Sequence, residues 1–570
     1  MTYNPENPLI VQGDHTVLVE VDSPLYPAAR DRLAGFAELV KSPEYIHTYR
    51  ITPLSIWNAC AAGMKATELT ASLVQFSKYP VPEHILTEIH DYASRYGRLR
   101  LSLNEKGLVL FSTDEILAEE IAHNRHVNRF LSERISPVEF LIHPANRGRI
   151  KQALIKIGFP AEDVAGYTEG EAIAISLKDI ALSGDAFSLR PYQWKAAATY
   201  YAGGTVRGGS GVVVLPCGAG KTIVGIACMS HVKSSTLILT TSVTATRQWI
   251  SELLDKTTLT EDEIGEYSGN TKEVRPVTIA TYQIMTYRKS RESEFVHLNL
   301  FDQRNWGLII YDEVHLLPAP VFQITADIQA RRRLGLTATL VREDGREDDV
   351  FALIGPKKVD VPWKEMEGQG WIAKARCSEI RLDMPTDLRM SYAVADARKK
   401  FRIASENPLK LQVARTIIDF HKDEQILLIG MYLDQLKIIA GELDIPVLTG
   451  STSQKKRDKL YGDFKEKRIK VLAVSKVANF AVDLPDATVA IQISGTYGSR
   501  QEEAQRLGRI LRPKKGLNQA FFYTIVTRDT VEQDFALKRQ LFLCEQGYEY
   551  HIETADELNS KRIPRSLGQD

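Results

Sequence analysis

The sequence predicts an α/β protein with two doubly wound parallel-sheet domains in tandem, preceded by a mainly helical, winged-helix-like N-terminal region and a small α/β module. Short, wholly apolar runs separated by helix-length segments indicate the two domains, because a parallel sheet is covered on both faces. The pattern occurs twice. A chain of 570 residues is also longer than a single hydrophobic core can serve, so about three or four domains are expected.

Five apolar runs predict the strands of each domain. The first set is GVVVL (211–215), TLILTT (236–241), VTIATY (277–282), GLIIYD (307–312) and LGLTAT (334–339). The second set is QILLIG (425–430), PVLTG (446–450), KVLAVS (470–475), TVAIQIS (488–494) and AFFYTIV (520–526). The repetition predicts two similar domains.

The N-terminal third has a different pattern. Residues 29–42 and 55–76 carry apolar residues at helical spacing, and paired prolines follow the second segment. Within residues 98–112, apolar and polar residues alternate on both sides of an Asn-Glu-Lys-Gly turn. This pattern predicts a β-hairpin. Helices followed by a hairpin are the order of a winged helix, and a second α/β patch runs from 139 to about 177.

Composition excludes several classes of protein. The chain is 44% hydrophobic and 25% charged, and 72 basic residues balance 72 acidic ones, so any site for a polyanion must be local. Five cysteines without CxxC pairs argue against a disulfide framework and a zinc ribbon, which favours a reducing cytoplasm. The N-terminus lacks a signal-peptide pattern and no apolar stretch reaches about 18 residues. We expect a protein that is neither secreted nor membrane-spanning.

A glycine loop between a strand and a helix predicts a phosphate site. Gly218 and Gly220 permit a tight loop whose amides face phosphate oxygens, Lys221 would neutralise the β- and γ-phosphates, and the Thr222 hydroxyl would bind Mg²⁺. The strict motif asks for glycine at the position of Leu215, and a bare GAGKT can be a surface turn. The predicted nucleotide contacts are Leu215, Pro216, Cys217, Gly218, Ala219, Gly220, Lys221 and Thr222.

Two acidic residues end the strand GLIIY. Asp312 suits binding Mg²⁺, and Glu313 suits orienting or deprotonating the attacking water. The alternative is an acidic corner between strand and loop, but the phosphate loop upstream makes the pair specific. His315 is more often a structural residue, although beside Glu313 it could sense the γ-phosphate.

Upstream of the loop, Gln193 could read the adenine edge and Arg190 could stack on or bond to the base. An ordinary helix start at Pro191 is the alternative.

A second set of candidate residues lies in the second domain. The sequence predicts a helix that would put Gln505, Arg509 and Arg512 near one face, at spacings of four and three. Arginines fixed on a packed helix can stabilise charge on a transferring γ-phosphoryl group, as an arginine finger does. The alternative is a solvated basic helix.

The order of motifs resembles the XPB branch of superfamily 2 DNA helicases, over residues 187–545 nearly continuously. The resemblance rests on LRPYQ, LPCGAGKT, DEVH, LTATLVREDGRE, VSKVANFAVDLPDA and QRLGRILR. It implies two RecA-like motor domains, and LPCGAGKT is itself the form this branch uses.

The resemblance also assigns roles to single residues. Arg342, Glu343 and Asp344 match the RED motif, which is associated with strand separation. Residues 382–402 stand where the family inserts its thumb, here short, with Arg398 and Lys399 as DNA contacts. Ser475, Lys476 and Asp483 match the motif that couples nucleotide to DNA. Thr241, Arg247 and Thr281 fall in the strand-tracking motifs.

The predicted domains follow from these assignments. They are a helical, winged-helix-like domain (1–125), a small α/β damage-recognition-like module (126–180), an ATP-binding RecA-like domain (181–362), a second RecA-like domain (363–545) and a polar tail (546–570).

The implied function is an ATP- and Mg²⁺-dependent 3′-5′ DNA helicase in nucleotide excision repair, cytoplasmic at the nucleoid and monomeric. Its partners would be DNA, at single-strand and duplex junctions, and a repair nuclease or other repair proteins, with no membrane. An RNA helicase, a duplex translocase without strand separation and an ATP-switched scaffold for repair partners remain as alternatives.

Overall fold

The chain folds into two compact units. The computed structural model describes residues 3–33, 35–41, 45–205, 208–216, 218–269, 271–290, 295–327, 331–338, 347–361, 363–475, 487–495, 503, 506–508, 510–511, 518–545, 547–548 and 550–560. The first unit lies within residues 1–361 and the second lies mainly within residues 362–570.

Seven parallel strands of the described chain form the main sheet of the first unit, in the order β12-β13-β11-β14-β15-β10-β16. The strands are β10 (Ser210–Val214), β11 (Thr236–Thr240), β12 (Ile264–Tyr267), β13 (Val277–Thr281), β14 (Leu308–Asp312), β15 (Arg332–Thr337) and β16 (Lys357–Asp360). The helices are α8 (Pro191–Tyr201), α9 (Lys221–Val232), α10 (Val243–Lys256), α11 (Tyr282–Met285), α12 (Ala319–Asp327) and α13 (Glu347–Leu353).

The central strands of this sheet are buried on both faces. Every residue of β11 and β13 is buried, as the uninterrupted apolar runs require of a parallel sheet covered by helices. The five predicted strands are present. The edge strands β12 and β16 were not predicted.

The second unit repeats this architecture. Seven parallel strands of its described part have the order β19-β20-β18-β21-β22-β17-β23. They are β17 (Lys374–Leu382), β18 (Ile426–Gly430), β19 (Val447–Leu448), β20 (Val471–Ser475), β21 (Val489–Gln492), β22 (Gln519–Thr527) and β23 (Tyr550–Thr554). The helices are α14 (Trp363–Gly368), α15 (Thr386–Val394), α16 (Ala397–Ser405), α17 (Lys410–Phe420), α18 (Leu433–Glu442), α19 (Gln454–Lys465), α22 (Val531–Glu545) and α23 (Ala555–Ser560). The prediction of two parallel α/β domains in tandem is confirmed.

The segment predicted as a polar tail contributes to this second sheet. β23 pairs in parallel with β17 from Cys377 to Arg381, and α23 follows it directly. The sheet therefore extends past residue 545, where the predicted domain ends. The predicted thumb-like segment, 382–402, contains α15 and most of α16.

The N-terminal region contains more strand than its helical patterns predicted. A sheet in the order β1-β2-β4-β3 packs with helices at the start of the chain. Its elements are β1 (Leu9–Val11), β2 (Thr16–Glu20), α1 (Tyr26–Leu33), β3 (Glu38–Lys41), β4 (Ile46–Arg50), α2 (Pro53–Ala61), α3 (Ala66–Phe76) and α4 (Glu83–Arg95).

Two of the helical patterns were wrong in detail. The helix expected over 29–42 ends at Leu33, and Glu38–Lys41 forms strand β3 instead. The single helix expected over 55–76 is two helices, because Gly63 between α2 and α3 has a φ of +97°, which a helix cannot continue through.

The predicted hairpin is present and joins a larger sheet. β5 (Leu99–Asn104) and β6 (Gly107–Ser112) pair in antiparallel register, and Gly107 turns with a φ of +121°. They belong to a five-stranded sheet in the order β7-β8-β6-β5-β9. Its other elements are α5 (Glu115–His123), α6 (Arg125–Asn128), β7 (Leu131–Ser136), β8 (Glu139–Ile142), α7 (Arg147–Lys156) and β9 (Ala161–Asp163). The sheet therefore spans the predicted boundary at residue 125.

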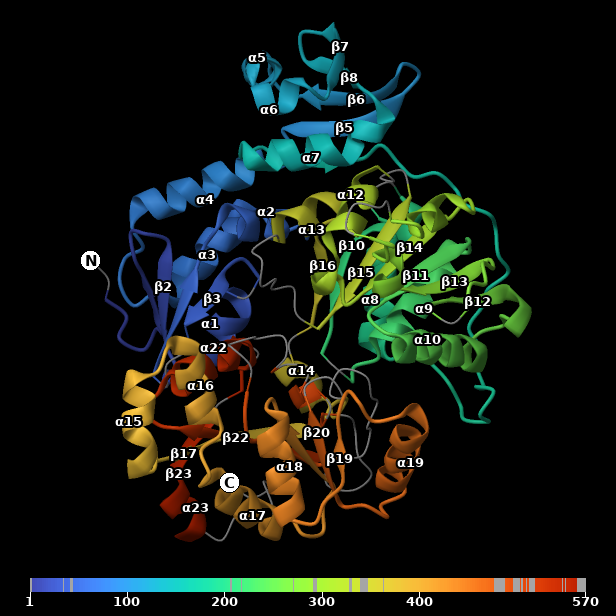
Figure 1. Ribbon diagram of the computed structural model, residues 1–570. Helices are drawn as coiled ribbons and strands as arrows, with labels where there is room; N and C mark the ends of the chain where they lie inside the picture. Colours follow the sequence, from blue (N-terminus) through green and yellow to red (C-terminus); the bar gives the residue numbers. More distant parts are fainter. Residues whose placement is uncertain are drawn as a thin grey trace. The chain divides into compact units, whose positions relative to one another are not determined.

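Helix α7 covers one face of this five-stranded sheet (Figure 1). Its apolar residues Ile150, Ala153 and Leu154 pack with Leu99 and Leu101 of β5. The helices of the described residues lack the combination of length and apolarity that a bilayer crossing requires.

We expect acid to destabilise the second unit through His421. This side chain is buried, and its Nε2 lies 3.0 Å from the hydroxyl of Tyr523. Burial lowers the pKa of His421 to about 4, whereas the unfolded chain takes up the proton near pH 6.5. Stability should therefore fall between pH 6.5 and pH 4, by up to about 3 kcal/mol.

Urea unfolding at pH 7.0 and pH 4.5 measures this effect. In His421→Gln the amide keeps a polar group beside the Tyr523 hydroxyl but cannot titrate, so the loss of stability on acidification should be smaller than in the wild type. An equal pH dependence in both proteins would show that His421 does not contribute.

Candidate nucleotide-binding site

The carboxyl ends of three neighbouring strands bring the predicted nucleotide residues together. β14, β15 and β10 are adjacent and parallel, so Asp312, Thr337 and the loop after Val214 lie at the same edge of the sheet. The Leu215 amide donates to the Thr337 carbonyl, at 3.0 Å, which continues the pairing of β10 and β15. Ligands bind at this edge in doubly wound sheets.

The glycine loop has the backbone that the sequence predicts. Gly218 and Gly220 have φ values of +82° and +78°, which favour glycine. Helix α9 begins at Lys221, directly after Gly220, so the loop leads into a helix N-terminus where free amides attract phosphate. Thr222 lies in the first turn of α9.

Lys221 and the two acidic residues form a buried charge cluster. The Lys221 Nζ donates to the Glu313 Oε1 at 2.9 Å, and both side chains are less than one-fifth exposed. Burial and the charge of Glu313 raise the pKa of Asp312 to about 6. Although burial favours the protonated form of Glu313, Lys221 and His315 hold its pKa below the usual value. Glu313 is therefore ionised at neutral pH, as a general base requires.

His315 connects the ends of β14 and β15. It lies in the short helix Val314–Leu316 and is buried. Its Nδ1 lies 2.7 Å from the Thr337 Oγ1 and 3.5 Å from the Glu313 Oε2. Glu313 itself has a φ of +49°, an uncommon conformation for a residue with a side chain. The histidine thus supports the turn that carries Glu313.

The cluster suits a magnesium ion held with the nucleotide. The Asp312 and Glu313 carboxylates lie together at this edge beside Lys221, and Mg²⁺ prefers such oxygen ligands. Asp312 and the Thr222 hydroxyl would hold the ion. When bound, Mg²⁺ would neutralise charge on the β- and γ-phosphates.

The predicted base-reading residues lie beside the loop. Gln193 is buried and lies against Gly220 of the loop. A Cβ added to Gly220 would lie only 2.6 Å from the Gln193 Nε2. Its Oε1 accepts from the backbone amide of Arg190 at 3.0 Å, which caps α8. The Arg190 guanidinium donates to the Tyr192 hydroxyl at 3.2 Å. Gln193 is thus fixed close to the nucleotide loop.

The predicted DNA contacts occupy several elements. In the first unit, Thr241 is exposed after β11, and the Arg247 side chain is 61% exposed on α10, 3.7 Å from Glu266. Thr281 is buried instead, and its hydroxyl accepts from the Ile284 amide as the cap of α11.

The predicted DNA contacts of the second unit differ in exposure. Arg398 and Lys399 lie exposed in the first turn of α16, whereas Ser475 is buried at the end of β20. Nine predicted residues lie outside the described residues: Cys217, Arg342, Glu343, Asp344, Lys476, Asp483, Gln505, Arg509 and Arg512.

Sequence reasoning missed three contacts of the site. The indole of Trp249 donates to the Asp312 Oδ2 at 3.0 Å, and the Tyr282 hydroxyl donates to the Asp312 carbonyl at 2.9 Å. Thr337 contacts His315, as above. The LTAT residues at the end of a predicted strand could have indicated Thr337. Trp249 ends the segment 240–249 that resembles a strand-tracking motif, but nothing in the sequence indicated that Trp249 or Tyr282 contacts Asp312.

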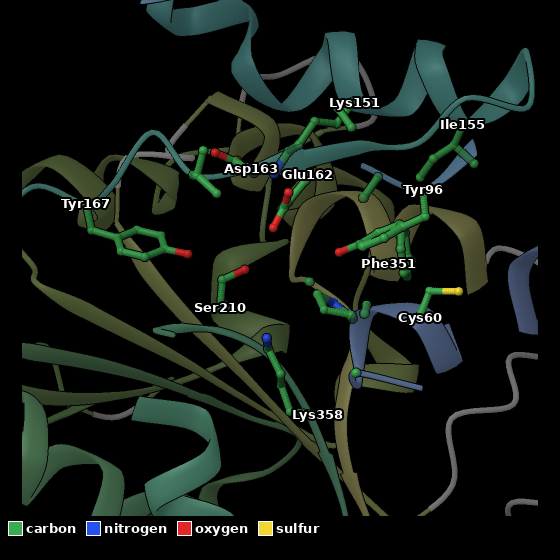
Figure 2. A pocket seen from close by; sticks show the side chains of 17 residues that line it. Cys60, Tyr96, Lys151, Ile155, Glu162, Asp163, Tyr167, Ser210, Phe351 and Lys358 are labelled. Carbon is green, nitrogen blue, oxygen red and sulfur yellow. Dashed lines mark hydrogen bonds and ion pairs between the residues drawn. The ribbon is translucent and has the colours of Figure 1, made fainter. Parts of the chain in front are cut away.

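A cavity of about 270 Å³ lies elsewhere in the first unit, and none of its lining residues is a predicted site residue (Figure 2). Beside it Asp163 accepts from Arg147, at 2.7 Å and 3.0 Å, and from Lys151, at 2.9 Å. Burial lowers the pKa of Lys151 to about 8, and Lys151 and Arg147 hold the pKa of Asp163 well below its usual range despite burial. This ion cluster ties α7 to β9.

Three family models match the chain. "ERCC3/RAD25/XPB C-terminal helicase" matches residues 366–565, and "Type III restriction enzyme, res subunit" matches 186–342. "Helicase conserved C-terminal domain" matches 9–136, in the N-terminal region despite its name.

Curated relatives match over nearly the whole chain. The "DNA 3′-5′ helicase XPB" proteins of Kineococcus radiotolerans and Mycobacterium tuberculosis are each 54% identical, over 97% of this chain and 98% and 99% of their own lengths. The "General transcription and DNA repair factor IIH helicase/translocase subunit XPB" of Enterocytozoon bieneusi is 34% identical, over 96% of this chain and 93% of its own. The chain therefore belongs to the XPB family of DNA 3′-5′ helicases.

Proposed function

We propose that the protein couples ATP hydrolysis to 3′-5′ movement along DNA and opens the duplex. The Lys221–Glu313–Asp312 cluster at the carboxyl edge of three strands is the observation that carries this proposal. It combines a cation that can bind phosphate (Lys221), a general base (Glu313) and a metal ligand (Asp312). The names of the relatives with 54% identity support the substrate and the direction.

The chemistry divides among these residues. Lys221 leaves Glu313 for the β- and γ-phosphates when nucleotide binds, which frees the carboxylate to orient and deprotonate water. Gln505, Arg509 and Arg512 are proposed to stabilise the charge of the γ-phosphoryl group. Asp483, Ser475 and Lys476 are proposed to couple nucleotide state to DNA.

The remaining predicted residues are assigned to the DNA. Thr241 and Arg247 would contact the strand backbone, and Arg398 and Lys399 would grip the duplex from the short thumb. Arg342, Glu343 and Asp344 would separate the strands. Because such contacts release counterions from the backbone, DNA binding should weaken steeply as salt rises.

We infer that the protein acts in DNA repair, through nucleotide excision repair. The name of the Enterocytozoon relative supports a role in repair. The predicted modules at 1–125 and 126–180 are proposed to engage damaged DNA or a repair nuclease, while 181–362 and 363–545 serve as motor domains. The protein would act as a monomer at the nucleoid.

ATP hydrolysis and strand displacement, measured together, test the proposal. The wild-type protein is incubated with ATP and Mg²⁺ plus forked DNA, blunt duplex or single-stranded RNA. Turnover stimulated by forked DNA, with displacement of a 3′-tailed substrate, is the expected result. ATP hydrolysis that DNA stimulates without strand displacement would identify a duplex translocase. Hydrolysis stimulated by RNA alone would identify an RNA helicase, and no hydrolysis would identify an ATP-switched scaffold. Each of these three results contradicts the proposal.

A further inference from the structure

The side chain of Trp249 donates a hydrogen bond to one oxygen of the Asp312 carboxylate. Trp249 is 1% exposed, and its Nε1 lies 3.0 Å from the Asp312 Oδ2. The Glu313 amide donates to the other oxygen, Oδ1, at 3.1 Å. An ionised carboxylate has about four acceptor positions, so two donors fix its rotation and leave acceptor positions for a hydrated cation.

The position of the indole is set by a glycine in the helix that follows the phosphate loop. A Cβ on Gly225 would lie 2.4 Å from the Trp249 Cη2 and 3.2 Å from the Leu336 Cδ1. Non-bonded carbon atoms do not approach to 2.4 Å, so any larger residue at position 225 must displace the Trp249 ring. Trp249 therefore fits between α9, which begins at Lys221, and β14, which ends at Asp312.

Trp249 also belongs to the helix that carries predicted DNA contacts. The Ser242 hydroxyl accepts from the Ala245 amide at 3.2 Å and caps α10, and the Thr246 hydroxyl lies 2.8 Å from that of Thr240. Arg247, two residues before Trp249, is exposed. Helix α10 thus carries the predicted DNA contact Arg247 and, two residues later, the donor to Asp312.

We propose that Trp249 is a positioning residue that orients Asp312 toward the magnesium–nucleotide complex. The inference rests on the proposed function, because it assigns Asp312 to the metal. The alternative is a merely structural role, in which the indole fills the core and its N–H uses the nearest acceptor. If Trp249 orients Asp312, losing it should weaken nucleotide binding only when Mg²⁺ is present. If Trp249 only fills the core, losing it should change nucleotide binding equally with and without Mg²⁺.

Nucleotide binding with and without metal separates these roles. Affinity for ADP and for a non-hydrolysable ATP analogue is measured by calorimetry in Mg²⁺ and in EDTA. In Trp249→Phe, which keeps an aromatic ring but loses the donor, we expect the affinity gained from Mg²⁺ to fall about tenfold, or about 1.4 kcal/mol. Affinity in EDTA should stay within about twofold of the wild type.

Gly225→Ala provides a second, independent variant. It keeps the indole N–H but displaces the ring, so it should also reduce the affinity gained from Mg²⁺. If both changes act through the Asp312 hydrogen bond, the double variant should lose no more than Trp249→Phe alone, since residues that act on one contact are not additive. Independent losses that add in the double variant would contradict the inference.

Trp306→Phe is the matched control. Trp306 is fully buried in the same unit, and its indole donates to the Leu300 carbonyl at 2.9 Å, so this variant removes the same group away from the site. It should leave the Mg²⁺ effect unchanged. An equal loss of affinity in Mg²⁺ and EDTA for Trp249→Phe overturns the inference. A wild type that gains no affinity from Mg²⁺ contradicts the proposed ATP site instead.

Discussion

Replacing Glu313 with glutamine is expected to abolish most ATP hydrolysis while leaving nucleotide binding intact. General-base catalysis contributes about 10²- to 10⁴-fold, so single-turnover hydrolysis in Glu313→Gln should be at least about 100-fold slower than in the wild type. Glu313 is the base in the proposed mechanism, and the glutamine amide cannot accept the proton. DNA strand displacement should be lost with hydrolysis.

The affinity for nucleotide should not fall in this variant. Lys221 donates to Glu313 at 2.9 Å, and bound phosphate oxygens would compete with this carboxylate for the ammonium group. Removing the negative charge weakens the competing contact, so equilibrium binding of ATP should be equal or tighter. Reduced binding together with slow hydrolysis would instead indicate a damaged site.

Glu171→Gln serves as the control for Glu313→Gln. Glu171 lies in the same unit, is partly exposed and forms an ion pair with Arg304. Loss of an exposed ion pair changes stability by less than about 1 kcal/mol, and hydrolysis should stay at the wild-type rate. Turnover in Glu313→Gln within about tenfold of this control would contradict the role of Glu313 as the base.

Of the strands in the two parallel sheets that the sequence did not predict, β12, β16 and β23 are edge strands, whereas β17 is paired on both sides. Central strands such as β11 and β18 are apolar throughout because helices cover both faces. β16, with the sequence KKVD, and β23, with YHIET, lie at sheet edges, where one side is open and polar residues are tolerated. Their polar composition hides them from a search for apolar runs.

The candidate site residues were predictable for a related reason. Asp312 ends strand β14 and Lys221 follows the loop after strand β10, and the parallel arrangement brings these strand ends to one edge. The contact between Trp249 and Asp312 joins residues 63 positions apart on a helix and a strand. Its geometry depends on how α10 packs against α9, which hydrophobic periodicity does not encode.

A buried ion pair in the second unit gives the largest expected effect on stability. The Lys410 Nζ donates to the Glu532 Oε1 at 2.6 Å and to the Ile493 carbonyl at 2.8 Å, and both charged side chains are at most 1% exposed. Lys410→Met leaves the Glu532 carboxylate buried without its cation. Breaking such a pair typically costs about 3 to 5 kcal/mol, so the free energy of unfolding should fall by that amount.

A second substitution at Glu532 separates the charge from the packing. The Glu532 Oε2 accepts from the Thr527 amide at 3.0 Å, and a glutamine carbonyl can still accept that hydrogen bond. In Lys410→Met with Glu532→Gln no uncompensated charge is buried, and replacing both members of a buried pair is often close to neutral. We therefore expect denaturant unfolding, followed by circular dichroism, to show the double variant recovering most of the lost stability. A double variant as unstable as Lys410→Met would mean that Lys410 acts through its hydrogen bond to Ile493 and its packing, since the charge of Glu532 would then contribute nothing.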